Sequence, residues 1–343
     1  MRRLILSLGI LTTLIAAAAL TRVSLLGRSQ SSSSSPSSSS VRAVPAPAVR
    51  KAWTRPHTPW GEPDLQGKWS YATITPLERP SAQAGREALT AEEVAAVDAD
   101  ARTGADRRDG GAEADLARAY NAYWYDRGTS TGRTALIVDP PDGRLPPLTP
   151  EGRRRQALAD ERERTHPYDS WEDRPLQERC IVYHGVPPLP TGYNNTYQIF
   201  QTPGYVAILD ENIHDVRGIP LDGRPHLGQG IRQWNGDSRG RWEGDTLVVE
   251  TTNYSPRTIF KFPAAGETLH AVERFTRVAV DRIDYQFTIT DPTTYTRSWT
   301  ASLPLAGLPG YVIYEYACHE GNYSIRNVLS GARAQEASAS RAR

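Results

Sequence analysis

The chain has 343 residues, of which 40 are basic and 39 acidic, and it contains two cysteines. This balance, without a long block of like charge, gives no electrostatic footprint for nucleic acid or for an anionic membrane surface. We therefore expect a small-molecule ligand, no nucleic-acid partner, and membrane contact only through an N-terminal anchor.

The first residues have the layout of an export signal. Two arginines precede "LILSLGILTTLIAAAAL", an uncharged apolar run that ends in small residues. We expect residues 1–22 to be a signal peptide or a retained N-terminal anchor, and the alanines favour cleavage. Residues 23–50 are rich in serine and proline and poor in apolar side chains, so they predict a disordered linker. The sequence thus predicts an exported protein, periplasmic or secreted, which a retained N-terminal segment would tether to the membrane.

The remainder, residues 51–335, predicts a single β-rich domain followed by a disordered tail at 336–343. Helical insertions are expected at about 90–125 and 150–165. The first opens with a threonine and a glutamate in capping-box spacing, and the second opens with a threonine N-cap followed by proline.

Beyond Tyr193 the chain predicts antiparallel strands. Short stretches of alternating or apolar residues are separated by turn signals such as "TPG" and "DG". Strands spaced in this way predict a mainly β fold, a calycin-like antiparallel barrel or a strongly curved sheet with peripheral helices. The expected strands are "TYQIF", "YVAIL", "DVRGIPL", "DTLVVETTN", "LHAVERFTR", "RIDYQFTIT", "RSWTASL" and "YVIYEYAC". Earlier strands are expected around Trp69 and at Leu136 to Val138. A last short helix is expected at about 324–335.

Side chains alternate along a strand, so each predicted strand has two faces. In "YVIYEYACHE", Glu315 and His319 share one face, while the tyrosines and Cys318 share the other. If the tyrosine face packs in the core, Glu315 and His319 point either to water or into a lumen, and the sequence leaves both open. In "LHAVERFTR", the two faces are His270, Val272, Arg274 and Thr276, and Leu269, Ala271, Glu273 and Phe275.

The polar faces favour acid–base chemistry. A histidine and a carboxylate near a guanidinium in a partly desolvated cavity have pKa values suited to proton transfer. The leading hypothesis is a cofactor-independent lyase, isomerase or hydrolase of a small organic or sugar-like molecule. In it His319 and His270 exchange protons, Glu315 orients His319, Arg274 holds an anionic group, and Glu320 lies at the strand end. A cross-strand ladder of ion pairs is the structural alternative.

Other residues are candidates for substrate binding. "ENIHDVRGIPLDGRPH" places His214, Asp215 and His226 on either side of a stiff turn, and Trp234 and Trp299 offer rings that could stack on a substrate. The same barrel cavity could instead hold a ligand without chemistry, as in a calycin-like binding protein.

A divalent metal is the third hypothesis. His214, His226 and His319 could converge on it, although no pair has tight zinc spacing. No phosphate loop, dinucleotide fingerprint or haem motif occurs, so we predict no organic cofactor.

Cys180 and Cys318 are the two cysteines. Export makes a disulfide between them a reasonable expectation, and it would stabilise the fold by about 4 kcal/mol in the chain-entropy model. Two separate buried thiols are the alternative.

Two resemblances add to this reading. The stretch "DLQGKW" resembles the Gly-x-Trp opening of calycin-type barrels such as lipocalins, in which the tryptophan plugs one barrel end. The motifs "TPWGEPDLQGKW", "IHDVRGIPLDGRPH", "GDSRGRWEGDTLVVETTNY" and "YEYACHEGNY" together resemble a family of exported, largely uncharacterised bacterial proteins, over about Thr58 to Arg333. That resemblance implies one exported domain and no particular activity, catalytic residue or cofactor.

Overall fold

The computed structural model of the protein describes residues 53–104, 125–183, 185–258 and 268–342. The expected signal segment and linker, and the latter part of the first helical insertion, lie outside the described residues. Ala52–Arg343 form one compact unit. Within the described ranges, no helix has both the length and the apolar character needed to cross a bilayer.

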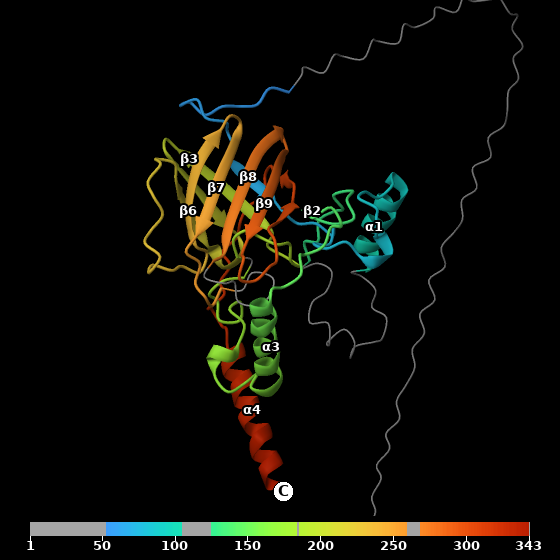
Figure 1. Cartoon of the computed structure of the whole chain (residues 1–343), viewed down its shortest axis with the longest axis vertical. Helices are drawn as coiled ribbons and strands as arrows, with labels where there is room; N and C mark the ends of the chain where they lie inside the picture. The colour runs from blue at the N-terminus through green and yellow to red at the C-terminus, as the bar shows by residue number, and fades with distance from the viewer. Residues whose placement is uncertain (1–52, 105–124, 184, 259–267, 343) are drawn as a thin grey trace, which may run out of the picture. The chain divides into compact units, whose positions relative to one another are not determined.

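One antiparallel sheet curves into a nearly closed barrel, as predicted (Figure 1). Its hydrogen-bonded order is β5-β4-β3-β1-β11-β9-β8-β7-β6, and β10 pairs with β9 and β2. β5 and β6, at the two ends of that order, lie beside each other without a hydrogen-bonded ladder. The strands are β1 (Gly67–Ser70), β2 (Ile137–Asp139), β3 (Thr196–Thr202), β4 (Tyr205–Asp210), β5 (Val216–Pro220), β6 (Asp237–Glu243), β7 (Thr246–Thr252), β8 (His270–Ala279), β9 (Arg282–Thr290), β10 (Trp299–Ser302) and β11 (Leu305–Gly307).

The barrel interior is a packed core. Along β9 every second side chain is buried, from Ile283 through Tyr285 and Phe287 to Ile289, because inward and outward positions alternate. The rings of Phe275 and Tyr285 lie 4.5 Å apart, within the range of favourable aromatic contacts. The expected two-sided character of this strand is therefore correct.

Trp69 of β1 is also buried in this core. Its indole Nε1 donates a hydrogen bond to the Leu65 carbonyl oxygen at 2.9 Å, and the Arg277 guanidinium lies 5.1 Å from the centre of its ring. The tryptophan of the Gly-x-Trp stretch thus contributes packing to the barrel.

The strand predicted for "YVIYEYAC" is wrong. Residues 311–323 contain no strand, and Tyr314 is 75% exposed instead of being part of the core. The reason is that β11, a strand that we did not predict, pairs with both β1 and β9. Neither neighbour keeps a free edge at that position, so the following residues leave the sheet. β6 was also missed, since "DSRGRWE" is polar and reads as part of a turn.

The helices are α1 (Ala91–Gly104), α3 (Pro150–Thr165) and α4 (Ser324–Arg341), with short 3-10 turns η1 (Ser81–Gln83), η3 (Trp171–Asp173) and η4 (Asn212–His214). Thr90 and Glu93 form the expected capping box, with hydrogen bonds of 3.2 and 2.8 Å. Thr149 caps α3 by accepting a hydrogen bond from the Gly152 amide at 3.0 Å.

α4 is longer than predicted. We expected it to end near Gln335 and to be followed by a disordered tail, but it continues to Arg341. The sequence after Gly331 contains no glycine or proline and is rich in alanine, arginine and other residues that tolerate a helix, so nothing in it stops the helix earlier.

Cys180 and Cys318 form a disulfide, with their Cα atoms 5.7 Å apart. The alternative of two separate thiols is wrong. The bond joins the chain ahead of β3 to residues 311–323, the segment between β11 and α4.

Candidate functional site

The loop between β4 and β5 gathers polar groups at one end of the barrel. We call Glu211–Asp215 the ENIHD loop. The Asp210 amide donates to the Asp215 carbonyl oxygen at 2.8 Å, which closes the loop onto the end of β4. The Asp210 carboxylate accepts hydrogen bonds from the Tyr71 hydroxyl at 3.0 Å and from the Asn212 amide at 3.3 Å.

The backbone of this loop is strained. Ile213 and His214 both have positive φ, 56° and 45°. A β-branched residue in the left-handed region is a genuine outlier, and such residues cost of order 1–3 kcal/mol each. Conformations of this kind persist where the surroundings fix them, and they cluster at functional sites.

The loop also carries buried polar atoms without hydrogen-bond partners among the described residues. They are Glu211 Oε2 and both side-chain polar atoms of Asn212, and Asn235, which donates to Asp215 from outside the loop, adds its Oδ1. Glu211 and Asn212 are each only 2% exposed. Because an unsatisfied buried polar group costs about 1–3 kcal/mol, a concentration of them calls for an explanation such as a ligand-binding role.

Burial raises the pKa values of several carboxyl groups here. Burial raises the pKa of the Asp210 carboxyl well above its usual range, and the neighbouring Asp215 raises it further. Burial likewise raises the pKa of Asp215, although the Asn235 amide hydrogen bond at 3.1 Å acts in the opposite direction. Desolvation, followed by the charge of Glu211, raises the pKa of Asp126. Clustered carboxyls with raised pKa values are typical of acid–base sites.

Two cavities meet at Asp210. One, of about 10 Å³, is lined by Asp210, Asp215, Arg217 and Asn235 and has room for about one water molecule. The other, of about 220 Å³, opens beside the ENIHD loop. Its lining residues are Leu209, Asp210, Glu211, His214, Ile313, Tyr314 and Glu315.

His214 is oriented within the larger cavity. Its ring Nδ1 lies 3.1 Å from the Tyr316 carbonyl oxygen. A carbonyl oxygen can only accept, so Nδ1 carries the proton, and Nε2 of the neutral ring is a proton acceptor. The cavity therefore combines a carboxyl whose pKa burial raises with an imidazole whose Nε2 is an acceptor.

Beside this site, an ion pair lies inside the barrel. Arg217 of β5 binds both carboxylate oxygens of Glu273 on β8, and the Tyr285 hydroxyl donates to Glu273 Oε1 at 2.8 Å. The two charged side chains are 9% and 0% exposed. Burial alone would lower the pKa of Arg217, but Glu273 raises it, so the guanidinium stays charged.

The structure separates the predicted catalytic residues on β8 from this site. Arg274 lies on the outer face of the barrel, where it binds Glu243 at 2.9 Å. His270 is half-buried at the start of the strand, opposite Thr290. The face that points inward carries Ala271, Glu273 and Phe275. The polar face of β8 therefore faces water.

The predicted residues in 311–323 are divided. Glu315 is exposed and lines the 220 Å³ cavity with His214. His319 and Glu320 are exposed in the turn before α4, where the His319 carbonyl oxygen accepts from the Asn322 amide. The expected contact in which Glu315 orients His319 required a strand, which this segment does not form.

The predicted substrate-binding residues also lie apart. Asp215 and His214 belong to the ENIHD loop, whereas His226 binds Asp237 at 3.0 Å outside either cavity. Trp234 is half-buried, and its carbonyl oxygen accepts from the Thr258 hydroxyl. Trp299 is fully buried against Phe287 and Tyr295, so its ring is part of the core.

The three histidines proposed for a metal lie in different surroundings. Among the described residues, no group of three or more His, Cys, Asp or Glu side chains is arranged to hold a metal ion. His214 lies in the ENIHD loop, His226 pairs with Asp237, and His319 is exposed ahead of α4.

The residues that the sequence analysis missed are Asp210, Glu211 and Asn212. The available signal was their position: "DEN" follows the apolar strand "YVAIL" directly and precedes the next strand by only a few residues. Polar residues at strand ends on a short connection are favourable places for a site.

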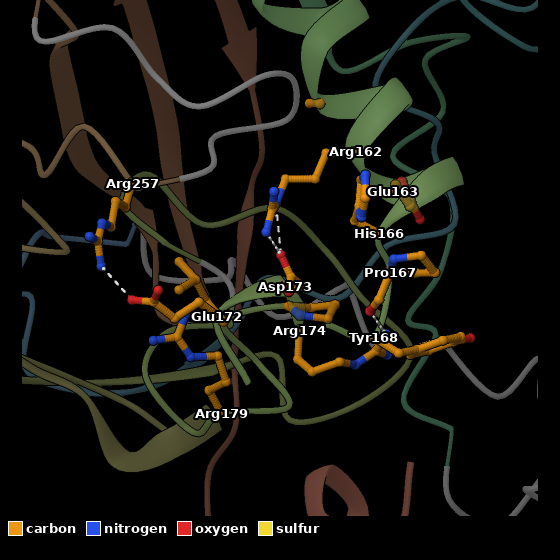
Figure 2. A pocket seen from close by; sticks show the side chains of 13 residues that line it. Arg162, Glu163, His166, Pro167, Tyr168, Glu172, Asp173, Arg174, Arg179 and Arg257 are labelled. Carbon is orange, nitrogen blue, oxygen red and sulfur yellow. Dashed lines mark hydrogen bonds and ion pairs between the residues drawn. The ribbon is translucent and has the colours of Figure 1, made fainter. Parts of the chain in front are cut away.

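A larger cavity lies elsewhere, beside α3 (Figure 2). It has a volume of about 820 Å³ and includes none of the residues of the ENIHD loop.

Comparisons of the chain with protein-family models, with curated proteins and with solved structures find no match.

Proposed function

We propose that the protein is a cofactor-independent acid–base enzyme whose active centre is the 220 Å³ cavity at the ENIHD loop. Asp210 donates a proton to the substrate, and Nε2 of His214 accepts one. The observation that carries the proposal is that the buried Asp210 carboxyl, whose pKa is raised, and the His214 imidazole, whose Nε2 is an acceptor, line the same cavity.

Two further features support a functional role for this loop. The left-handed backbone at Ile213 and His214 and the unpaired buried atoms of Glu211 and Asn212 both lower stability. Evolution tolerates such costs most readily where a site needs a particular geometry.

The cavity favours a small, uncharged substrate. Its charged lining residues are carboxylic acids, and Arg217 nearby is already bound to Glu273. Leu209, Ile313 and Tyr314 add apolar surface for a ring. The volume is below the roughly 300–1,000 Å³ of drug-sized sites. We therefore propose a neutral sugar-like molecule, in a lyase, isomerase or hydrolase reaction, in place of an anion held by Arg274.

We further propose that the protein acts outside the cytoplasm. The Cys180–Cys318 disulfide is compatible with an oxidising compartment, and the N-terminal sequence has the layout of an export signal.

The test is a panel of neutral aldoses, ketoses and p-nitrophenyl glycosides, incubated with the protein and followed by proton NMR. We expect at least one member to be isomerised or cleaved, or to undergo elimination. Asp210→Asn and His214→Gln should each lower kcat about 100-fold or more, the usual contribution of one acid or base.

His226→Gln and Arg274→Gln are the matched controls, because both residues lie outside the cavity and should leave kcat unchanged. A panel in which no member changes chemically, or turnover that survives both site substitutions, would contradict the proposal.

A further inference from the structure

The 820 Å³ cavity lies between the C-terminal half of α3 and the chain that follows it, residues 167–179 (Figure 2). Its volume is within the range of small-molecule sites. The wall is rich in guanidinium groups, which come from Arg162, Arg174, Arg179 and Arg257.

Three of these arginines have carboxylate partners. Arg162 binds Asp173, as the dashed lines in Figure 2 mark, and Arg174 binds both oxygens of Glu178 at 2.8 and 2.7 Å. Arg257 lies 3.6 Å from Glu172, beyond normal hydrogen-bond distance, with both side chains more than half exposed.

Arg179 differs from the others. Within the described ranges no carboxylate forms an ion pair with it, and its guanidinium carbon lies 4.6 Å from the centre of the Trp171 ring. The residue is half-buried. Stacking on an indole fixes the plane of a guanidinium while leaving its N–H groups in that plane able to donate.

A guanidinium presents parallel N–H donors that match the oxygens of a carboxylate or a phosphate. Arg257 also lines the cavity. Glu172 holds it only weakly, so Arg257 can contribute a second positive charge beside Arg179. Glu163 and Tyr168 lie at the other side of the cavity, and Glu172 lies toward Arg257 (Figure 2). We propose that this cavity is a second binding site, which recognises a small molecule through a carboxylate or phosphate group held by Arg179.

The probes are inorganic phosphate and D-glucuronate, with D-glucose as the uncharged counterpart of the latter. Titration is followed by the NMR signal of the Arg179 Nε–H group. We expect a saturable shift with phosphate, with glucuronate or with both, which identifies the preferred anion, and no shift with glucose. The affinity should fall as salt is added.

Arg179→Gln should weaken binding at least 10-fold, measured by calorimetry. Arg164→Gln is the matched control, because Arg164 is an exposed arginine of α3 that pairs with Glu161 and does not line the cavity. Asp210→Asn should bind the anion normally, so this result is independent of the proposed enzyme activity. Absence of a saturable shift with both anions, or equal affinity in Arg179→Gln, would overturn the proposal.

Discussion

At the scale of single residues, the buried charge pair in the barrel has a large energetic consequence. Glu273 is fully buried and receives hydrogen bonds from Arg217 and Tyr285. Such a pair is not necessarily a net source of stability, since both ions lose their hydration. Removing one member, however, leaves the other charge buried and uncompensated.

We therefore expect Glu273→Gln to lower the free energy of unfolding by about 3–5 kcal/mol, measured by urea denaturation. The double variant Arg217→Met with Glu273→Gln removes both charges and keeps an amide oxygen for the Tyr285 hydroxyl, so it should recover most of that loss. Arg274→Gln, one position along β8 on the outer face, should change stability little. A double variant as unstable as Glu273→Gln would show that the charge imbalance is not the cause.

The same residues show what the sequence could predict. Strand alternation correctly separated Glu273 from His270 and Arg274, because it depends only on the local backbone. It could not show that Glu273 faces the lumen, since the side chain that makes this tolerable is Arg217, 56 positions away. We assigned the polar face to the site because His270 and Arg274 fall on a polar strand face of the same meander as Glu315 and His319.

At the scale of elements, the segment 311–323 depends on tethers rather than on a sheet. Among the described contacts, its links to the rest of the protein include the disulfide, the hydrogen bond from His214 to the Tyr316 carbonyl oxygen, and the Tyr311 hydroxyl, which donates to Glu211 at 2.6 Å. The sequence suggested a strand because tyrosine, valine and isoleucine have high strand propensity. Propensity cannot indicate whether a sheet edge is free, and here β11 occupies it.

We expect the double variant Cys180→Ser with Cys318→Ser to increase the local opening of residues 311–323 more than that of the barrel strands. Hydrogen exchange at 311–323 should become much faster, whereas amides of β8 and β9 should stay protected because their ladder remains intact.

Reduced wild-type protein should behave as the double variant does, which controls for effects of the serine side chains. If exchange accelerated equally in β8, β9 and 311–323, the disulfide would be supporting the barrel itself and not this segment.

At the scale of the whole molecule, the barrel could be predicted because each of its longer strands carries its own alternating pattern and turn signals. Two of its strands, β6 and β11, could not be predicted, since they are short or polar and acquire strand structure from their neighbours. Local sequence patterns also could not show that side chains fill the interior of the barrel. Among the described residues, large aromatic side chains from β3, β8, β9 and β10 occupy the centre of the sheet's inner face. The proposed active centre therefore lies at the barrel end, in the loop that the strands position.

The pH dependence of global stability tests whether the buried carboxyl groups at this end of the barrel have raised pKa values. Asp210, Asp215 and Asp126 have raised pKa values, so the folded state binds protons that the unfolded chain has already released above about pH 4. Their contribution to stability is fully present below that pH and is lost as the pH rises toward each folded-state pKa. Each unit by which a pKa is raised corresponds to about 1.4 kcal/mol. Asp222 acts in the opposite sense, because the Arg224 hydrogen bonds lower its pKa to about 2, so its effect is lost only as the pH falls toward that value.

We expect the free energy of unfolding of Asp210→Asn, measured in urea at pH 5 and pH 8, to fall less with rising pH than that of the wild type. The asparagine oxygen can still accept from the Tyr71 hydroxyl and the Asn212 amide, so the substitution removes the ionisation while keeping those hydrogen bonds. Asp284→Asn removes a carboxylate that is about half exposed, beside Arg282, and should follow the wild-type dependence. An Asp210→Asn curve parallel to the wild type would mean that Asp210 is ionised in the folded protein across this range, and it could not then serve as the proton donor of the site.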